Sequence, residues 1–545
     1  MKIAIYQFNA ILGDFTYNAD QVLKGLTLGK NMGCDLVLFP EAALFGYHPV
    51  DLLERPDSVK KQMQQMERVH KKMPEGIGAL VGAITLNPQK NGKAYLNAAV
   101  FLQKNKKPKI FAKQLLPTYD VFDEARHIEP GETKNNILKF RGHKFLVTIC
   151  EDIWAWPLPQ EKYSRYRFNP LQKIKGIKFD AVLNLSASPF TDLKYRGRRY
   201  VTKKTAQQFK APMFYANLLG AQDELIFDGA SFVIDKNGNL LAQAKDFEED
   251  FIIFDLDKNA SSHKKTKVPP IDDDRIRRYR KALVIGLRDF CAKLGLNKVH
   301  LGLSGGIDSA LVACIACEAL GPENVTVVAM PSQFNSAKSL QLAKAQAKNL
   351  GCHFYEIPIQ EMYRTILGGF QNSVGNFDFQ ITNENMQARI RGMLLMAYSN
   401  LTGSILLNTS NKSELAMGYS TLYGDLCGGL CVIGDLVKGD VYDLARDYNS
   451  QNEIIPKEVI TRPPSAELRP NQKDEDSLPP YALLDKTIEK LVESYQSPRG
   501  EVDKRVVNAM MKSEFKRWQA PPILKVTDHA FGRGRRLPIA HRAFV

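Results

Sequence analysis

Three residues with reactive side chain types stand just past or near the ends of predicted strands. Glu41 lies in LVLFPEAALFGY, Lys113 in KIFAKQLLPTYDVFDE and Cys150 in FLVTICEDIW. A thiol is the best nucleophile among side chains at neutral pH once a nearby base takes its proton. Glu41 can be that base, and an adjacent Lys113 can hold the thiolate and then the oxyanion of a tetrahedral intermediate. The three types together predict covalent catalysis by a thiol.

Each of these residues also has an ordinary structural explanation. A cysteine at the end of an apolar strand is usually a buried small hydrophobe, and lysine and glutamate are mostly surface residues. The flanking sequence favours chemistry, because the three segments in this order resemble the carbon-nitrogen hydrolase (nitrilase) superfamily over about residues 1–257. The resemblance implies amide hydrolysis through a thioester, with Cys150 as nucleophile, Glu41 as general base and Lys113 as transition-state stabiliser. It also implies a four-layer αββα sandwich.

The same resemblance implies a site for L-glutamine. Tyr119, in LLPTYDVFDE, and Ser188 with Lys194, in SASPFTDLK, fall where glutamine amidases of this family hold the amino and carboxylate ends of the substrate. The backbone N–H of Glu151 is a candidate for the oxyanion site. Glu124 has two open interpretations: the family's second loop glutamate, which assists the chemistry, or a partner in a surface ion pair.

A second group of residues forms a glycine turn, HLGLSGGIDSAL, between an apolar strand and a helix. Backbone N–H groups and a helix N-terminus converge on an anion in such a turn, and phosphate is the natural ligand. The P-loop pattern GxxxxGK[ST] is absent here, so the turn is not that of a Walker ATPase. SGGxDS resembles instead the pyrophosphate-binding loop of ATP-dependent adenylating amidotransferases. A turn with a purely structural role is the alternative.

Five further segments resemble the synthetase domain of the glutamine-dependent NAD synthetase family over about residues 276–545: FNSAKS, ITNENMQARIRG, LNTSNKSELAMGYSTLYGD, IGDLVKGDVYDLA and PPSAELRPNQKDEDSLPPYALLD. The resemblance implies ATP binding by Gly302, Leu303, Ser304, Gly305, Gly306, Ile307, Asp308, Ser309, Thr409 and Lys438. It implies deamido-NAD binding by Asn385, Glu414, Asp425 and Lys516. Asp308 and Glu414 are the implied ligands of Mg²⁺, a hard ion that prefers oxygen. Singly, each polar residue could equally be a helix cap or a surface partner.

Two positions depart from the family pattern, and two cysteine pairs allow a different interpretation. Phe334-Asn335 stands where a tyrosine and a small hydroxyl residue are expected, and Gly439 follows Lys438 where threonine is usual. These departures concern the shape of the nucleotide pocket. Cys314-x-x-Cys317 and Cys427-x-x-x-Cys431 raise the question of a zinc site. The first pair lies in an apolar helix without suitable histidines nearby, which favours core packing.

The elements that position these residues indicate two α/β domains. Residues 1–257 alternate β-branched runs such as KIAIYQ, KFLVTIC and DAVLNLSA with helical stretches, and both faces of the strands are apolar, which indicates sheets covered on both sides. Residues 258–275, rich in charge and containing Pro269-Pro270, are typical of a linker. From 276 to 545 the order strand, glycine turn, helix, strand begins a doubly wound parallel sheet of the adenine nucleotide alpha hydrolase type.

Length and composition limit the possible classes of protein. The 545 residues are more than one hydrophobic core usually serves, and 44% hydrophobic with 24% charged residues excludes a largely disordered chain. The sequence contains no run of about 18 apolar residues that would span a membrane and no secretory leader. Eight cysteines are too few for a disulfide scaffold. We therefore expect a cytoplasmic protein without a membrane partner, and the synthetase resemblance implies a homodimer or larger homo-oligomer.

The expected reaction is ATP-dependent amidation of deamido-NAD to NAD with ammonia from L-glutamine. An adenylated intermediate gives AMP and pyrophosphate, and the glutaminase gives glutamate. Another glutamine-dependent adenylating amidotransferase is the nearest alternative. The net charge of +15 and FGRGRR near the C-terminus suit an RNA-binding modification protein, but RNP-type aromatic motifs and a zinc ribbon are absent, so no nucleic acid partner is expected. An inactive scaffold conflicts with the presence of both the triad and the phosphate loop.

Overall fold

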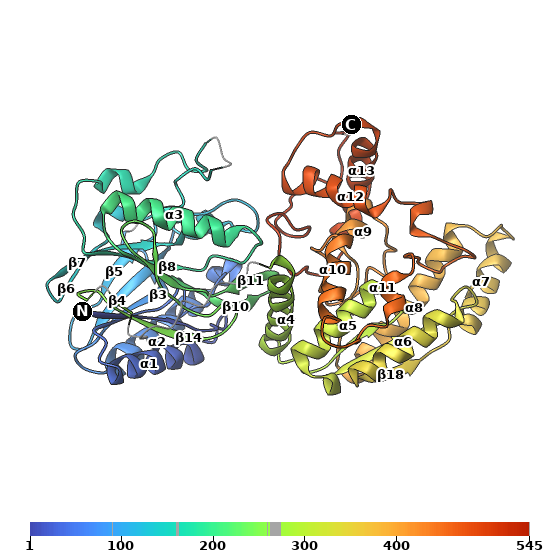
Figure 1. Ribbon diagram of the computed structural model, residues 1–545, viewed down its shortest axis with the longest axis horizontal. Helices are drawn as coiled ribbons and strands as arrows, with labels where there is room; N and C mark the ends of the chain where they lie inside the picture. The colour runs from blue at the N-terminus through green and yellow to red at the C-terminus, as the bar shows by residue number, and fades with distance from the viewer. Residues whose placement is uncertain (90, 160–162, 259, 262–273, 544–545) are drawn as a thin grey trace. The chain divides into compact units, whose positions relative to one another are not determined.

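The computed structural model describes residues 1–89, 91–159, 163–258, 260–261 and 274–543. It divides into two compact units, Met1–Asp273 and Asp274–Val545 (Figure 1). The predicted linker, residues 258–275, lies mostly outside the described residues, and helix α4 (Arg275–Lys293) begins at its end. Among the helices of the described ranges, none has the length and apolar character that crossing a bilayer requires.

The first unit contains two large sheets. The described strands of one sheet run in the order β15-β14-β1-β2-β3-β4-β5, and those of the other in the order β13-β12-β9-β8-β7-β6. The first comprises β1 (Lys2–Gln7), β2 (Leu36–Leu38), β3 (Gly78–Leu86), β4 (Tyr95–Gln103), β5 (Lys109–Ala112), β14 (Asp250–Asp255) and β15 (Ala260–Ser261). The second comprises β6 (Ile137–Phe140), β7 (His143–Ile149), β8 (Ala181–Ser186), β9 (Met213–Asn217), β12 (Phe232–Ile234) and β13 (Leu240–Gln243). The short pair β10 (Leu219–Gln222) and β11 (Leu225–Asp228) forms a separate ribbon.

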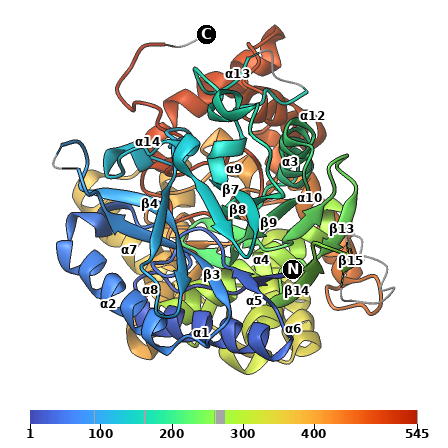
Figure 2. The same cartoon turned by 90° about the vertical axis from the view of Figure 1, so that its left-hand side faces the viewer.

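The side chains of these strands alternate between two kinds of core. Ile3 and Ile5 of β1 pack with Val147 of β7 in the core between the sheets. Tyr6 faces the opposite way, in the cluster that includes helices α1 (Phe15–Asn31) and α2 (Pro56–Lys72). Helix α3 (Lys194–Phe209) covers the other sheet through Val201. Figure 1 shows α3 on one side of the sheets and α1 and α2 on the other, and in Figure 2 β3 and β4 lie side by side. The predicted αββα sandwich is confirmed.

The second unit is built on a parallel sheet with the strand order β18-β17-β16-β19-β20. Its strands are β16 (Val299–Gly302), β17 (Val325–Ala329), β18 (His353–Glu356), β19 (Ile405–Asn408) and β20 (Leu430–Cys431). The helices that the sites below use are α5 (Ile307–Leu320), α6 (Ala337–Leu350), α7 (Gln360–Val374), α8 (Ile381–Thr402), α9 (Lys412–Met417) and α10 (Lys438–Tyr448). The chain adds β17 and β18 on one side of β16 and then β19 and β20 on the other.

This reversal of strand order creates a topological switch point between β16 and β19. Right-handed crossovers place helices on opposite faces when the order reverses, which is the predicted doubly wound arrangement. On one face, Val328 and Leu406 pack against Leu395 of α8. Ligands of such sheets bind outside the carboxyl ends of the strands at the switch point. The glycine turn after β16 and the residues after β19 meet at that place.

Candidate active sites

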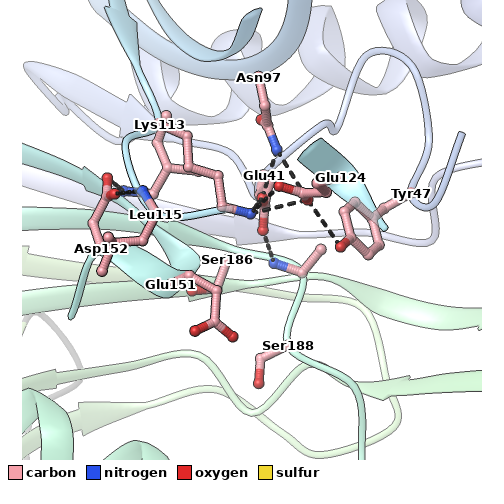
Figure 3. Close-up of polar contacts among 12 residues, drawn as sticks. Glu41, Tyr47, Asn97, Lys113, Leu115, Glu124, Glu151, Asp152, Ser186 and Ser188 are labelled. Atoms are coloured by element: carbon pink, nitrogen blue, oxygen red, sulfur yellow. Dashed lines mark hydrogen bonds and ion pairs between the residues drawn. The ribbon is translucent and has the colours of Figure 1, made fainter. Parts of the chain in front are cut away.

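Lys113 lies at the centre of a buried polar cluster in the first unit, one residue after β5 (Figure 3). Its Nζ donates to Glu41 Oε1 at 2.7 Å and to the two oxygens of Glu124 at 2.9 and 2.8 Å. Asn97 of β4 donates to Glu41 Oε1 at 2.8 Å, and the Tyr47 hydroxyl donates to Glu124 Oε1 at 3.0 Å. Burial alone lowers the pKa of Lys113, but the two carboxylates raise it well above its ordinary value. The ammonium therefore stays charged.

Cys150 is held in a strained turn directly after β7. Its φ is 40°, in the left-handed region, where residues other than glycine are strained and which is frequent at functional sites. Asp152 holds this turn, since one carboxylate oxygen accepts from the N–H of Ile149 at 3.0 Å. The other accepts from the N–H groups of Gln114 and Leu115 at 2.9 and 3.0 Å. The nucleophile candidate is thereby tied to the segment that carries the lysine.

The Cys150 thiol interacts electrostatically with both other members of the predicted triad. Burial raises its pKa well above the ordinary value, Glu41 raises it further, and Lys113 opposes this effect. The sulfur is therefore a neutral thiol at neutral pH and needs a base when it attacks. The structure brings Glu41, Lys113 and Cys150 together. Glu124 is a fourth buried member of this cluster, so its interpretation as a surface partner is wrong.

Two of the predicted glutamine-binding residues contact side chains that closely follow Cys150 in the chain. The Tyr119 hydroxyl donates to Glu151 Oε1 at 2.5 Å, and Tyr166 donates to Glu151 Oε2 at 2.8 Å. Lys194 begins α3, and its Nζ lies 4.3 Å from the centre of the Trp154 ring. The buried Glu151 carboxylate was not predicted, because the sequence pointed only to its backbone N–H.

Ser188, the third of these residues, lies in the loop after β8 and is buried. Its Oγ accepts from Arg198 Nε at 3.1 Å. In the same loop the N–H of Ala187 donates to Glu41 Oε2 at 2.8 Å. One loop thus carries a predicted substrate contact and a donor that fixes the predicted base.

The glycine turn of the second unit is closed by its own serines. Ser304 Oγ accepts from the N–H of Gly306 at 3.1 Å and bonds Ser309 Oγ at 3.1 Å. Gly305 has φ +80°, and a Cβ there would lie 2.3 Å from the Ser339 carbonyl oxygen. Gly306 is the N-cap of α5, so the backbone N–H groups of the turn and of the helix start lie together, which suits an anion.

This turn lines a cavity of about 290 Å³ at the switch point. Most of the predicted nucleotide-binding residues line it: Gly302, Leu303, Ser304, Gly306, Ile307, Asp308, Ser309, Thr409, Glu414, Asp425 and Lys438. Gly305 is not part of the lining, and its backbone lies against that of Ser339. Asn385 and Asp425 meet at Thr421, whose hydroxyl donates to Asn385 Oδ1 at 2.7 Å and whose N–H donates to Asp425 Oδ1 at 2.5 Å. Lys516 Nζ donates to the nearby carbonyls of Gly418 and Ser420 at 2.8 and 2.7 Å.

The two predicted metal ligands share one ammonium. Lys438 Nζ donates to Asp308 Oδ2 at 2.6 Å and lies 3.5 Å from Glu414 Oε1. The pKa of Glu414 is raised to about 8, mainly by burial and next by Asp308, while Lys438 opposes the rise. Repulsion between two carboxylates at a cavity wall is relieved by a divalent cation, and oxygen donors suit Mg²⁺. The residues present therefore fit the implied ion.

Comparison with known proteins assigns both units. A carbon-nitrogen hydrolase family model matches residues 2–158, and an NAD synthase model matches residues 279–520. The glutamine-dependent NAD(+) synthetase of Synechocystis sp. is 42% identical over 99% of this chain and 98% of its own. That of Aquifex aeolicus is 38% identical over 100% of both chains. The chain belongs to the glutamine-dependent NAD(+) synthetase family.

A solved structure agrees with this assignment. The glutamine-dependent NAD+ synthetase from Acinetobacter baumannii, in complex with ADP, is 34% identical with a TM-score of 0.77, covering 99% of this chain and 98% of that one. A structure from Cytophaga hutchinsonii, 19% identical with a TM-score of 0.82 over 99% and 98% of the two chains, shares the fold.

Two charged residues of the cavity in this member of the glutamine-dependent NAD(+) synthetase family were not predicted from the sequence. Arg391 lines the cavity and donates to the Met330 carbonyl at 3.0 Å and to Asn335 Oδ1 at 2.9 Å. Burial lowers its pKa to about 10, so the side chain stays charged at neutral pH. Asp474 also lines the cavity. Asn335, one of the departures from the family pattern, thus accepts a hydrogen bond from a charged residue of the cavity wall. Arg391 could not be singled out from the sequence, because the segment ITNENMQARIRG contains both Arg389 and Arg391 and nothing local distinguishes them.

Proposed function

We propose that the chain forms NAD⁺ by ATP-dependent amidation of deamido-NAD, with ammonia that Cys150 releases from L-glutamine. The observation that supports this most strongly is the buried cluster of Glu41, Lys113 and Glu124 at the Cys150 turn. A cluster of this kind occurs in the same chain as a phosphate-type glycine turn that lines a cavity at the switch point of the parallel sheet. The first site alone would only release ammonia from glutamine, and the second alone would have no nitrogen donor. Both are needed to transfer the amide nitrogen of glutamine to deamido-NAD.

In the glutaminase, Glu41 takes the thiol proton while the sulfur of Cys150 attacks the side chain carbonyl carbon of glutamine. Lys113 stabilises the oxyanion that develops, because its ammonium is fixed and dry before the reaction. Glu41 then passes the proton to the leaving nitrogen, and ammonia departs from a thioester. Water activated by the same carboxylate hydrolyses the thioester to glutamate. Tyr119, Ser188 and Lys194 hold the amino and carboxylate ends of the substrate.

In the synthetase, the nicotinate carboxylate of deamido-NAD attacks the α-phosphorus of ATP. The glycine turn from Ser304 to Ser309 holds the pyrophosphate that leaves, and Lys438 neutralises charge on the phosphates. Ammonia attacks the acyl-adenylate and AMP departs. Asp308 and Glu414 would hold Mg²⁺, which supplies charge neutralisation for the phosphates. Asn385, Asp425 and Lys516 are the proposed contacts of deamido-NAD. The solved relative that binds ADP supports ATP as the nucleotide.

The division of labour is tested by Cys150→Ala. The variant should make no NAD⁺ from glutamine but should retain synthesis when ammonium chloride replaces glutamine. Failure with ammonium chloride, in a variant that melts like the native protein, would show that the two sites do not divide the reaction in this way. Another acceptor acid is the nearest alternative, and only the true acceptor gives amide and AMP in equal amounts.

We also propose a homodimer through an apolar face of the second unit. Ile366, Phe370 and Val374 recur every four residues on α7 and are 42%, 44% and 60% exposed. Met393 and Met396 of α8, which packs on α7, are exposed as well. An apolar face of this kind marks an interface, and a second copy is the proposed occupant. A cytoplasmic location remains part of the proposal.

A further inference from the structure

Arg198 of α3 is buried and reaches the loop after β8 with its whole guanidinium. Its Nε donates to Ser188 Oγ at 3.1 Å, and its Nη2 donates to the carbonyls of Ser188 and Pro189 at 2.6 and 2.9 Å. Its Nη1 donates to Asp228 Oδ1 at 2.6 Å. The side chains of Arg198 and Asp228 are each 1% exposed. None of the roles proposed above uses this ion pair.

The surroundings of Ser188 leave it little freedom. Its N–H donates to Asn217 Oδ1 at 3.0 Å, and the amide nitrogen of Asn217 donates to the carbonyls of Ser188 and Gly229 at 3.3 and 3.0 Å. The backbone N–H, the carbonyl and the hydroxyl oxygen of Ser188 are therefore all held. A buried ion pair is costly to desolvate and contributes little net stability, so its presence beside a proposed substrate contact points to a positional role.

The direction of the Ser188 hydroxyl follows from its partner. Arg198 is always a donor, so Ser188 Oγ accepts from it and its own hydrogen is left for another acceptor, such as the neighbouring buried Tyr215 hydroxyl or a bound substrate. A carboxylate is the strongest acceptor that a hydroxyl meets in a substrate. The same loop also donates the Ala187 N–H to Glu41 Oε2, a backbone contact that is separate from the bonds that the Arg198 side chain makes.

We propose that Arg198 is a positioning residue that makes Ser188 a hydrogen-bond donor and thereby selects amides that carry an α-carboxylate. The inference rests on the proposed glutaminase activity. It adds the residue that makes the enzyme prefer L-glutamine to L-glutamine α-amide, in which the α-carboxylate is converted to an amide. A purely structural arginine would affect both substrates alike.

The variant Arg198→Lys keeps the charge but loses the planar fork that reaches Ser188 and Asp228 at once. The double variant Arg198→Met with Asp228→Leu removes the pair without leaving an unpaired buried carboxylate. Arg196→Met, an exposed position on the same helix, is the matched control. Glutaminase kcat and KM are measured with L-glutamine and with L-glutamine α-amide, and ammonia-dependent NAD⁺ synthesis is followed in the same samples.

The expected result is that both Arg198 variants raise KM for L-glutamine by about tenfold or more, as expected for a misplaced partner of a charged group. kcat and the KM for the α-amide should change little, and Arg196→Met should behave as the native protein. In a Ser188→Ala background, Arg198→Lys should add no further rise, because the two residues act as one unit.

Equal losses with both substrates, or effects of Ser188→Ala and Arg198→Lys that simply add, would overturn the inference. So would an unchanged preference for L-glutamine in variants that fold. A native protein that hydrolyses no glutamine would instead overturn the proposed function, so the two failures are distinguishable.

Discussion

At the scale of residues, the first unit is organised around a buried ammonium between two carboxylates. Lys113 contacts Glu41 and Glu124 and interacts with the Cys150 thiol. Because a raised thiol pKa keeps sulfur protonated, the reaction depends on a base and on a cation that is already in place. Under this mechanism, an acid-base group, a cation and a thiol have to be buried close together, as Glu41, Lys113 and Cys150 are.

The variant Lys113→Met should lower glutaminase kcat by about 100-fold or more, the usual cost of removing a group that stabilises an oxyanion. Ammonia-dependent NAD⁺ synthesis should persist, because the second unit does not use this lysine. Lys109→Met, an exposed lysine of β5, should leave both activities unchanged. Steady-state glutamate release measures the effect, and glutaminase activity close to native in Lys113→Met would contradict the assigned role.

Glu124 should give the glutaminase an acid limb in its pH profile. Its pKa is raised from 4.5 to about 7, mainly because the carboxyl group is buried; Lys113 opposes this rise and Glu41 adds to it. As pH falls through about 7 the carboxylate takes a proton and its hold on the Lys113 ammonium weakens, so kcat/KM should fall. Glu124→Gln should be less active and should lose this limb. The same limb in the variant would show that another group titrates.

Protonation of Glu124, which should lower activity, should stabilise the folded state. In the unfolded chain Glu124 titrates near 4.5, so between pH 4.5 and about 7 the folded state binds the proton more strongly. Its contribution to the free energy of unfolding is therefore present below pH 4.5 and is lost as pH rises to about 7. Protonation of Glu124 therefore lowers activity without itself destabilising the fold.

At the scale of elements, the strand-to-helix turn of the second unit requires glycine at position 305. Gly305→Ala adds a Cβ against the Ser339 carbonyl at a left-handed φ, and such strain costs on the order of 1–3 kcal/mol. We expect a raised KM for ATP in ammonia-dependent synthesis and native glutaminase activity of the first unit. Gly295→Ala is the control, because its φ is +71° and no heavy atom lies within 4 Å of the added Cβ. Equal ATP KM values for the two variants would contradict the assignment of the turn.

The sequence predicted those elements that carry a strong local pattern. The apolar run KIAIYQ corresponds to β1 (Lys2–Gln7), and Asn237-Gly238 lies in the turn between β12 and β13. Strands β10 and β11 were missed, since LGAQ, the sequence of β10, has no β-branched or aromatic residue that would indicate a hairpin. Family motifs located the triad and the glycine turn, whereas Arg198 and Arg391 act through contacts with residues distant in sequence and gave no local signal.

At the scale of the whole molecule, the exposed apolar face of α7 should hold two copies together. Phe370→Glu with Val374→Glu places charges on that face and should give a monomer in sedimentation equilibrium, whereas the native protein should be a dimer. Lys344→Glu, on the exposed part of α6, serves as control. A dimer that survives the double substitution would place the interface elsewhere.

The most direct test of the proposal follows the nitrogen itself. The protein is supplied with deamido-NAD, ATP and L-glutamine labelled with ¹⁵N in the side chain amide, and the NAD⁺ product is analysed by mass spectrometry. We predict that the label appears in the carboxamide of NAD⁺, with one AMP and one glutamate for each NAD⁺ formed. Unlabelled NAD⁺, or glutamate released without any amidation of deamido-NAD, would contradict the claim that the first unit supplies nitrogen to the second.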